Sequence, residues 1–314
     1  MARTAFSLRS VVFRNRVLVA SGTFGYGDEC TGEDGGSGPG GLITKSLSLK
    51  PRSGNPPVRI VETPSGMLNS IGLANIGVEE FVRGRLPRLR ALDIPVIANI
   101  AGSSLDEYAR VLDILEGEEG VAGYEINVSC PNVREGGLLF GTRCDMTAAL
   151  TRGLRPRTSR PLVLKLTPNV THVSEFARAV EAEGADAVSL INTLIGMAVD
   201  VRTRRPVLSS VTGGLSGPAI RPVALAKVWE AARAVRIPVI GIGGIMTPTD
   251  ALEFLIAGAT AIQVGTANFV DPSAAGRIAR GIEAFCDEQG IPDAGDLVGS
   301  LRAEPGASIV ESWL

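Results

Sequence analysis

Histidine, cysteine, lysine and aromatic residues are all scarce in this sequence of 314 residues. The only histidine is His172, so a catalytic cysteine here needs an arrangement other than the common cysteine–histidine pair. The four cysteines, Cys30, Cys130, Cys144 and Cys286, include no pair at CxxC spacing. The chain therefore carries no motif for a metal ion or a metal cluster, and a reducing cytoplasm is the expected setting.

The composition also argues against two kinds of partner. Aromatic residues make up only 4% of the chain, which is too few for a surface that stacks nucleic-acid bases. A formal net charge of −2 gives no electrostatic attraction to nucleic acid or to an anionic membrane. No apolar run reaches the roughly 18 residues that a membrane span requires. We expect neither nucleic acid nor a membrane as a partner.

Short apolar runs rich in β-branched residues recur along the chain, and helical patterns such as 104–117 and 224–235 lie between them. Such near-continuous runs are typical of parallel strands that are buried on both faces. Eight of them predict a closed (β/α)₈ barrel in a single domain spanning 1–314. An open doubly wound sheet is the alternative, but no strand leads into a GxGxxG helix start. The runs are 17–21, 41–45, 95–100, 124–129, 162–167, 187–193, 238–244 and 261–266.

Two other regions bear on the architecture. The N-terminal stretch "FSLRSVVFRNRVLVAS" predicts a β-hairpin of two short strands with a turn at Arg14–Asn15, which we favour over a targeting peptide. The segments 46–94 and 194–237, which follow the second and sixth strands, are long. Long loops after barrel strands are where binding and catalytic residues usually lie.

Polar residues and glycines stand at the carboxyl ends of all eight predicted strands, where barrel active sites form. Only four of the 31 basic residues are lysines, and two of these four stand at strand ends, which favours a need for a compact ammonium group. A single residue of this kind is commonly a turn former, but eight converging positions predict a site. They are Ser21, Lys45, Asn99, Asn127, Lys165, Asn192, Gly243–Gly244 and Gly265–Thr266.

The chemistry of these positions indicates what binds. The last two strands end in "GIGG" and "VGT", where main-chain N–H groups are available for a phosphate. The amides of Asn69, Asn127, Asn132 and Asn192 suit a neutral ring with alternating N–H and C=O groups, such as a pyrimidine. A phosphorylated ligand and a pyrimidine-like ring are therefore expected.

One thiol needs its own explanation. The run "YEINVS" ends at Cys130, which is followed by Pro131 and Asn132. A barrel that only binds a ligand leaves this cysteine unexplained. A lyase that forms a Schiff base on Lys165 is a further alternative from the residues alone.

Seven motifs in unbroken order resemble the class 1 dihydroorotate dehydrogenases, from about residue 5 to the C-terminus. They are "LNSIGLANIG", "EINVSCPNVREGG", "LVLKLTPNV", "SLINTLIGMAVD", "TGGLSGPAI", "PVIGIGGI" and "VGTANF". The stretch "SCPNVREGGLLFGT" is most similar to class 1B, whose members pass electrons to NAD through a second subunit.

The resemblance implies an FMN-binding (β/α)₈ barrel that oxidises dihydroorotate to orotate in pyrimidine biosynthesis. Cys130 would take the proton from ring carbon 5 as a general base, and Lys165 would stabilise negative charge on the flavin. The residues implied to hold FMN are Ser21, Lys45, Ser46, Asn99, Asn127, Lys165, Ile191, Gly217, Gly243, Gly244, Gly265 and Thr266. Those implied to surround the substrate are Lys45, Asn69, Ser70, Ile71, Gly72, Leu73, Asn127, Asn132, Asn192 and Thr193.

Class 1B also implies partners. A subunit that carries FAD and an iron–sulfur cluster would take the electrons, and a homodimer of this chain would form the core of a heterotetramer. A class 1A enzyme, which uses fumarate instead, is the alternative within the family. Neither class implies a metal ion on this chain.

Overall fold

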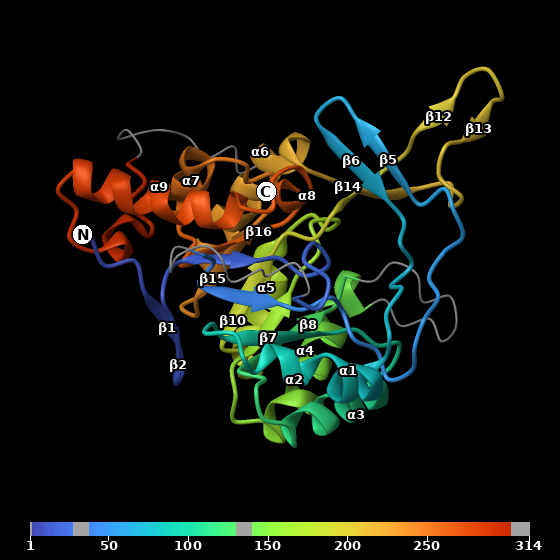
Figure 1. The fold of residues 1–314 in the computed structure, drawn as a ribbon, viewed down its shortest axis with the longest axis horizontal. Coiled ribbons are helices and arrows are strands. Elements are labelled where there is room, and N and C mark those ends of the chain that lie inside the picture. Colours follow the sequence, from blue (N-terminus) through green and yellow to red (C-terminus); the bar gives the residue numbers. More distant parts are fainter. Residues whose placement is uncertain (1, 28–37, 130–139, 303–314) are drawn as a thin grey trace.

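Eight parallel strands close into a barrel in the computed structural model of the chain, which describes residues 2–27, 38–129 and 140–302 (Figure 1). Around the barrel the strands follow one another in chain order. Seven of them lie within the predicted runs and β8 begins one residue before its run, so the predicted (β/α)₈ barrel is confirmed. The strands are β3 (Val17–Val19), β4 (Gly41–Ile43), β7 (Val96–Ile100), β8 (Gly123–Asn127), β9 (Leu162–Lys165), β10 (Ala187–Leu190), β15 (Val239–Ile242) and β16 (Ala261–Val264).

The barrel strands are buried along their whole length, because one face packs on helices and the other fills the barrel. Residues two apart on a strand point to the same side. An apolar cluster therefore contains one inward residue from nearly every strand, while the next inward residues toward the carboxyl ends are mostly polar. The strand residues of this cluster are Leu18, Ile43, Ile97, Val163, Ala187, Ile240 and Ala261.

The N-terminal hairpin packs on this apolar layer and completes it. It consists of β1 (Phe6–Leu8) and β2 (Val11–Phe13), with Phe6 opposite Phe13 and their rings stacked at 4.7 Å. The hairpin is confirmed, but the turn predicted at Arg14–Asn15 is wrong. The chain turns at Arg9, whose φ is 50°, and the Asn15 side chain instead accepts a hydrogen bond from Val17 N as the chain enters the barrel.

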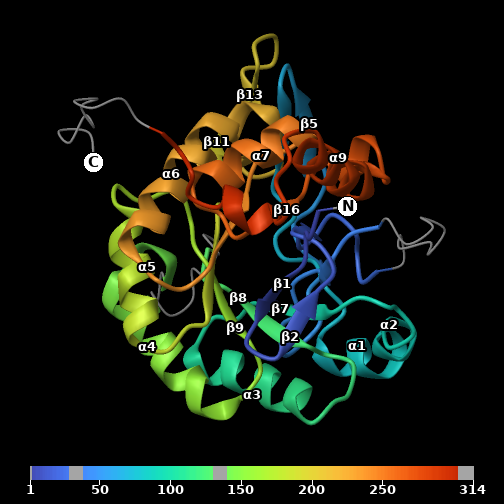
Figure 2. The ribbon, with the colours of Figure 1, turned by 90° about the vertical axis from the view of Figure 1, so that its left-hand side faces the viewer.

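Helices form the outer layer, and Figure 2 shows them surrounding the strands. The two predicted helices, 104–117 and 224–235, correspond to α3 (Leu105–Glu116) and α6 (Arg221–Ala234). Tyr108 of α3 is buried and donates a hydrogen bond to the main-chain oxygen of Asn127, which ties this helix to the carboxyl end of β8. The helices are α1 (Val78–Gly84), α2 (Leu86–Leu89), α3 (Leu105–Glu116), α4 (Cys144–Leu154), α5 (Val173–Ala182), α6 (Arg221–Ala234), α7 (Pro248–Ala257), α8 (Ala267–Val270) and α9 (Ala274–Glu288).

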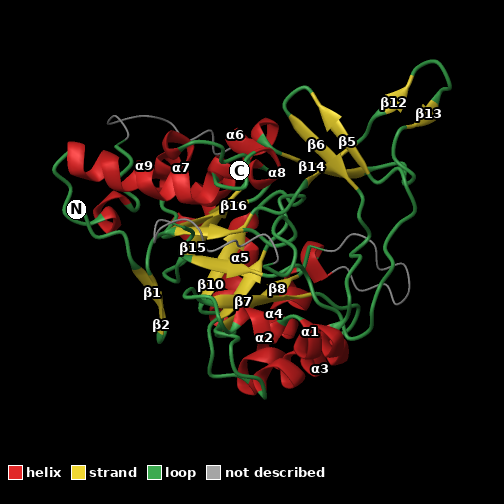
Figure 3. Ribbon diagram, in the orientation of Figure 1, coloured by secondary structure: helices red, strands yellow, loops and turns green. Residues whose placement is uncertain are grey.

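The two long segments after β4 and β10 combine into one antiparallel sheet beyond the carboxyl ends of the barrel strands. The first supplies β5 (Ile60–Thr63) and β6 (Gly66–Asn69), and the second supplies β11 (Leu194–Gly196) and β14 (Gly213–Ser216). Their order is β11-β14-β6-β5, and Asn69 lies opposite Gly214. Figure 3 shows this excursion sheet at one end of the molecule, with a small hairpin of β12 (Val199–Asp200) and β13 (Arg205–Pro206) projecting from it.

Three further features bear on membrane spans, metal sites and thiols. Within 2–27, 38–129 and 140–302, no helix is long and apolar enough to cross a membrane. The same residues hold no group of three or more metal-ligating side chains. Cys144 and Cys286 are unpaired thiols, whereas Cys30 and Cys130 lie outside the described residues.

Candidate active site

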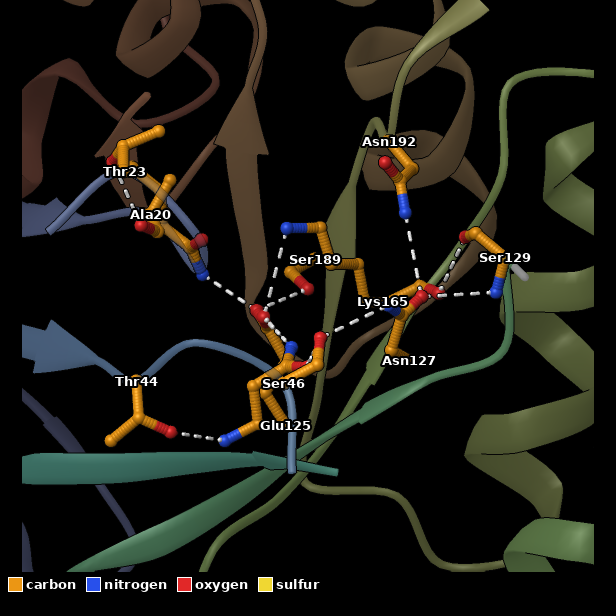
Figure 4. A network of polar contacts seen from close by, with 12 residues as sticks. Ala20, Thr23, Thr44, Ser46, Glu125, Asn127, Ser129, Lys165, Ser189 and Asn192 are labelled. Atoms are coloured by element: carbon orange, nitrogen blue, oxygen red, sulfur yellow. Dashed lines mark hydrogen bonds and ion pairs between the residues drawn. The ribbon is translucent and has the colours of Figure 1, made fainter. Parts of the chain in front are cut away.

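A polar layer lies inside the barrel, one step from the apolar layer toward the carboxyl ends (Figure 4). Its centre is Glu125 of β8, whose side chain is 1% exposed. Oε1 accepts a hydrogen bond from Asn99 Nδ2 at 2.7 Å, and Oε2 accepts from Ser189 Oγ at 2.8 Å and from Gln263 Nε2 at 2.7 Å. Side chains from four strands therefore meet at one buried carboxylate. These hydrogen bonds satisfy its oxygens, as buried polar groups require.

A row of side chains leads from this carboxylate toward the strand ends. Ser46 Oγ donates to Asn99 Oδ1 at 2.5 Å and accepts from Asn127 Nδ2 at 3.5 Å. Asn127 Oδ1 in turn accepts from Asn192 Nδ2 at 3.4 Å. We call Glu125, Asn99, Ser46, Asn127 and Asn192 the amide row. It brings together four of the predicted site residues, from four different segments of the chain.

Lys165 lies beside the amide row at the end of β9. It pairs with Asn127 in the strand register, and its side chain is 8% exposed. Its Nζ lies 3.7 Å from Glu125 Oε1, so a buried ammonium and a buried carboxylate face each other inside the barrel. Lys45 follows β4, directly before Ser46, and is half-buried. Both strand-end lysines thus adjoin the amide row.

The glycine-rich ends of β15 and β16 form a second part of the site. In the described part of the chain, no hydrogen bond uses the main-chain N–H of Gly244, Gly265 or Thr266. Gly244 has a φ of +74°, and a Cβ there would lie 2.8 Å from the main-chain nitrogen of Arg221. Only glycine fits this close approach. Unused N–H groups at two neighbouring strand ends suit a phosphate, so the residues present fit the phosphate end of FMN.

Other predicted cofactor residues border the same strand ends. Ser21 follows Ala20, whose main-chain N–H donates to Val264 O. Gly217 has a φ of +91°, and a Cβ there would lie 2.7 Å from Gly66 Cα and 3.6 Å from Thr266 Cγ2. The start of η3 (Pro218–Ile220) is therefore held between the excursion sheet and the end of β16.

Ile191, another predicted cofactor residue, is buried at the end of β10. A Cβ on Gly243 would lie 3.3 Å from Ile191 Cγ1. Ile191 and Gly243 therefore lie side by side at the ends of β10 and β15.

The predicted substrate residues are brought together only in part. Asn69 Nδ2 donates to Gly214 O at 3.3 Å, and the Thr193 side chain packs against Gly214. Ser70 Oγ is buried and has no hydrogen-bond partner among the described residues. By contrast, the next three residues, Ile71, Gly72 and Leu73, are held by nearby parts of the chain. Asn55 N donates to Ile71 O, and Asn75 Nδ2 donates to Leu73 O.

Cys130 and Asn132 lie outside the described residues, so their predicted roles stay predictions. Ser129, the last described residue before them, donates through its N–H to Asn127 Oδ1 and through its hydroxyl to Lys165 O. The last described residue before Cys130 is therefore bonded to two residues at the strand ends, Asn127 and Lys165. His172 precedes α5 at its N-cap position and is partly exposed.

Glu125, Ser189 and Gln263 belong to the polar layer but were not predicted from the sequence. Each interrupts an apolar run, in "YEINVS", "AVSLINT" and "AIQVGT". Glu125 stands two residues before Asn127, so strand alternation places both on the same face. That spacing is the signal in the sequence that would have found it.

Comparison with known proteins agrees with this geometry. The family model described as dihydroorotate dehydrogenase matches residues 4–286. The chain is 55% identical over 291 residues to "Dihydroorotate dehydrogenase B (NAD(+)), catalytic subunit" of Geotalea uraniireducens (strain Rf4), covering 93% of this chain and 95% of that protein. It is 52% identical over 304 residues to the protein of the same name from Desulforudis audaxviator (strain MP104C), covering 97% and 99%. The chain therefore belongs to the dihydroorotate dehydrogenase family.

Proposed function

We propose that this chain is the FMN-containing catalytic subunit of an NAD-linked dihydroorotate dehydrogenase, in which Cys130 and Lys165 act on the substrate and cofactor. Oxidation of dihydroorotate to orotate, a step of pyrimidine biosynthesis, is the activity of the family to which the chain belongs. The observation that carries the proposal is the amide row, which runs from a buried carboxylate to the strand ends beside Lys165.

The roles divide along the site. FMN, when bound, supplies the acceptor for the hydride that leaves ring carbon 6 of the substrate. Cys130 takes the proton from ring carbon 5 as a general base. The amides of Asn69, Asn127 and Asn192, with Asn132, hold the ring, and the Lys165 ammonium stabilises the negative charge that develops next to it.

The other residues implied for cofactor and substrate keep the roles given above. The excursion sheet supplies one wall of the site, because Asn69 and Gly214 pair within it. A Schiff base on Lys165 is not favoured, because that nitrogen faces a carboxylate at 3.7 Å and an ammonium ion is not a nucleophile.

Gly265→Ala tests the phosphate end of the site. A Cβ at this position meets only Ala20 Cβ at 3.6 Å and Thr23 Cγ2 at 3.9 Å, so the fold accepts the methyl group. The methyl group crowds the unused N–H groups, and we expect the dissociation constant of FMN to rise about tenfold, the worth of a lost hydrogen bond or two. Fluorescence titration of the apoprotein with FMN measures it.

The matched control is Gly117→Ala. Gly117 follows α3 at the other end of the barrel, and a Cβ there meets only Ile114 O at 3.6 Å. This variant should bind FMN as the unchanged chain does, and the thermal unfolding of both apoproteins should match that of the unchanged apoprotein. Equal FMN affinity in the two variants would place the phosphate elsewhere.

A second experiment concerns the molecule that accepts the electrons. The described residues hold no metal-ligating group, and the sequence contains no Rossmann fingerprint, so we assign NAD reduction to a partner subunit with FAD and an iron–sulfur cluster. The chain alone should oxidise dihydroorotate with dyes or oxygen and reduce NAD poorly. Co-expression with the partner should give a heterotetramer, built on a dimer of this chain, that reduces NAD.

Steady-state assays with NAD, with fumarate and with a dye distinguish the classes. Rapid fumarate turnover by the isolated chain, with no gain from a partner, would move the protein to class 1A. The cytoplasmic location expected from the sequence stays a prediction.

A further inference from the structure

We propose that Glu125 is a positioning residue that fixes the donor direction of the amide row and balances the charge of Lys165. This inference rests on the proposed function and deepens it, because it states which kind of ligand group the asparagines accept. Glu125 is not among the residues implied for cofactor or substrate, and its side chain is 1% exposed.

The first step is that a carboxylate can only accept hydrogen bonds. Asn99 must therefore turn its Nδ2 toward Glu125, at 2.7 Å, and its Oδ1 outward. That Oδ1 requires a donor, and the Ser46 hydroxyl supplies it at 2.5 Å. With its proton committed, Ser46 Oγ presents a lone pair to Asn127, which must then turn its Nδ2 inward.

The direction passes to the outer amides in the same way. Asn127 Oδ1 accepts from both Asn192 Nδ2 and the Ser129 N–H, and Asn192 Oδ1 accepts from the Thr193 N–H. Asn127 Oδ1 therefore uses both of its lone pairs and Asn192 Oδ1 uses one, whereas each Nδ2 retains a second proton. Asn127 and Asn192 face a ligand as donors, which suits carbonyl and carboxylate oxygens.

The second step concerns charge. Lys165 Nζ lies 3.7 Å from Glu125 Oε1, and both groups are buried, so each of these two charges compensates the other. Without the carboxylate, the ammonium would be an uncompensated positive charge beside the cofactor. Such a charge stabilises the reduced, negatively charged form of a flavin and raises its midpoint potential. Glu125 thereby limits how strongly Lys165 shifts that potential.

Two substitutions separate these effects. Glu125→Gln keeps the size of the side chain and removes its charge. Glu125→Asp keeps the charge but is one methylene shorter, so it withdraws from the 2.7 Å contact with Asn99. Ser189→Ala is the matched control, because it removes another hydrogen bond to the same carboxylate and leaves both the amide row and the ion pair in place.

The experiment uses the purified FMN-loaded chain. The midpoint potential is measured by equilibration with reference dyes, and the dissociation constant of orotate by the change in the flavin spectrum. We expect Glu125→Gln to raise the potential. We expect Glu125→Asp to keep the potential and to bind orotate about tenfold more weakly, the usual effect of a buried hydrogen bond that is lost. Ser189→Ala should change neither value, although its unfolding temperature falls.

Each result bears on the proposal. The proposal is overturned if Glu125→Gln leaves the midpoint potential unchanged. It is also overturned if the orotate dissociation constant of Glu125→Asp lies within about twofold of that of the unchanged chain, because a twofold change is smaller than the effect of one net hydrogen bond. If Glu125→Gln does not fold, the orotate affinity of Glu125→Asp decides the direction of the amide row. A failure of the proposed function is distinguishable, because the unchanged chain would then not oxidise dihydroorotate with a dye.

Discussion

Cys130→Ala should lower the rate of dihydroorotate oxidation by roughly 10²–10⁴-fold, the usual contribution of a positioned general base. The residue carries no role in holding FMN or the ring, so the variant should retain FMN and bind orotate with nearly unchanged affinity. Dye-linked turnover gives the rate, and the flavin spectrum gives the binding. Cys130→Ser should keep a little activity at high pH, where a hydroxyl loses its proton more readily.

Cys144→Ala is the matched control for the thiol. Cys144 is an unpaired, partly buried cysteine at the first position of α4, and its thiol donates to Glu175 O. It lies outside the polar layer, so its replacement should leave the rate unchanged. Near-normal turnover by Cys130→Ala, equal to that of the control, would show that another group takes the proton.

Lys165→Ala should slow the reduction of the enzyme by dihydroorotate by roughly 10²–10³-fold, as the loss of one preorganised charge donor does. Orotate binding should weaken less, because the charge that Lys165 meets develops during the reaction. The variant also leaves Glu125 buried without its counter-ion, which costs about 3–5 kcal/mol of stability. Stopped-flow absorbance follows the reduction, and thermal unfolding follows the stability.

Lys227→Ala separates the two effects. Lys227 is a mostly buried lysine in an ion pair, 3.0 Å from Glu230 Oε2, but it lies on the outer helix α6. We expect it to lose stability and to keep the rate of reduction. If reduction by dihydroorotate is as fast in Lys165→Ala as in this control, Lys165 has a structural role only.

The barrel was predictable from the sequence because its strands are buried on both faces. Two-sided burial leaves near-continuous apolar runs, which have few other interpretations at this length. The strand-end residues followed from the same pattern, since the residue after the last apolar position of a barrel strand faces the site. Lys165 and Asn127 are examples, and the structure brings them together in the strand register.

The excursion sheet, the hairpin turn and Glu125 could not be predicted, because they depend on contacts that do not appear in any local sequence pattern. The strands β5, β11 and β14 are only half-buried and carry no clear apolar alternation, and their partners lie far away in the chain. The hairpin turn was misplaced because Arg9 adopts a positive φ that favours glycine or asparagine, whereas Asn15 offered a more typical turn residue. Glu125 was missed because its two-residue spacing from Asn127 indicates only that the two share a face, whereas its partners on three other strands follow only from the fold.

The excursion sheet also has a consequence for how the chain folds. Asn69 and Gly214, which pair within it, are 145 residues apart, and β4 and β10, from which its two halves emerge, lie on different sides of the closed barrel. Bringing such distant segments together in an unfolded chain has a large loop-closure entropy, which barrel formation reduces beforehand. We therefore expect the wall of the site to form after the barrel and to open before it. The capacity to bind substrate should then be less stable than the barrel that carries it.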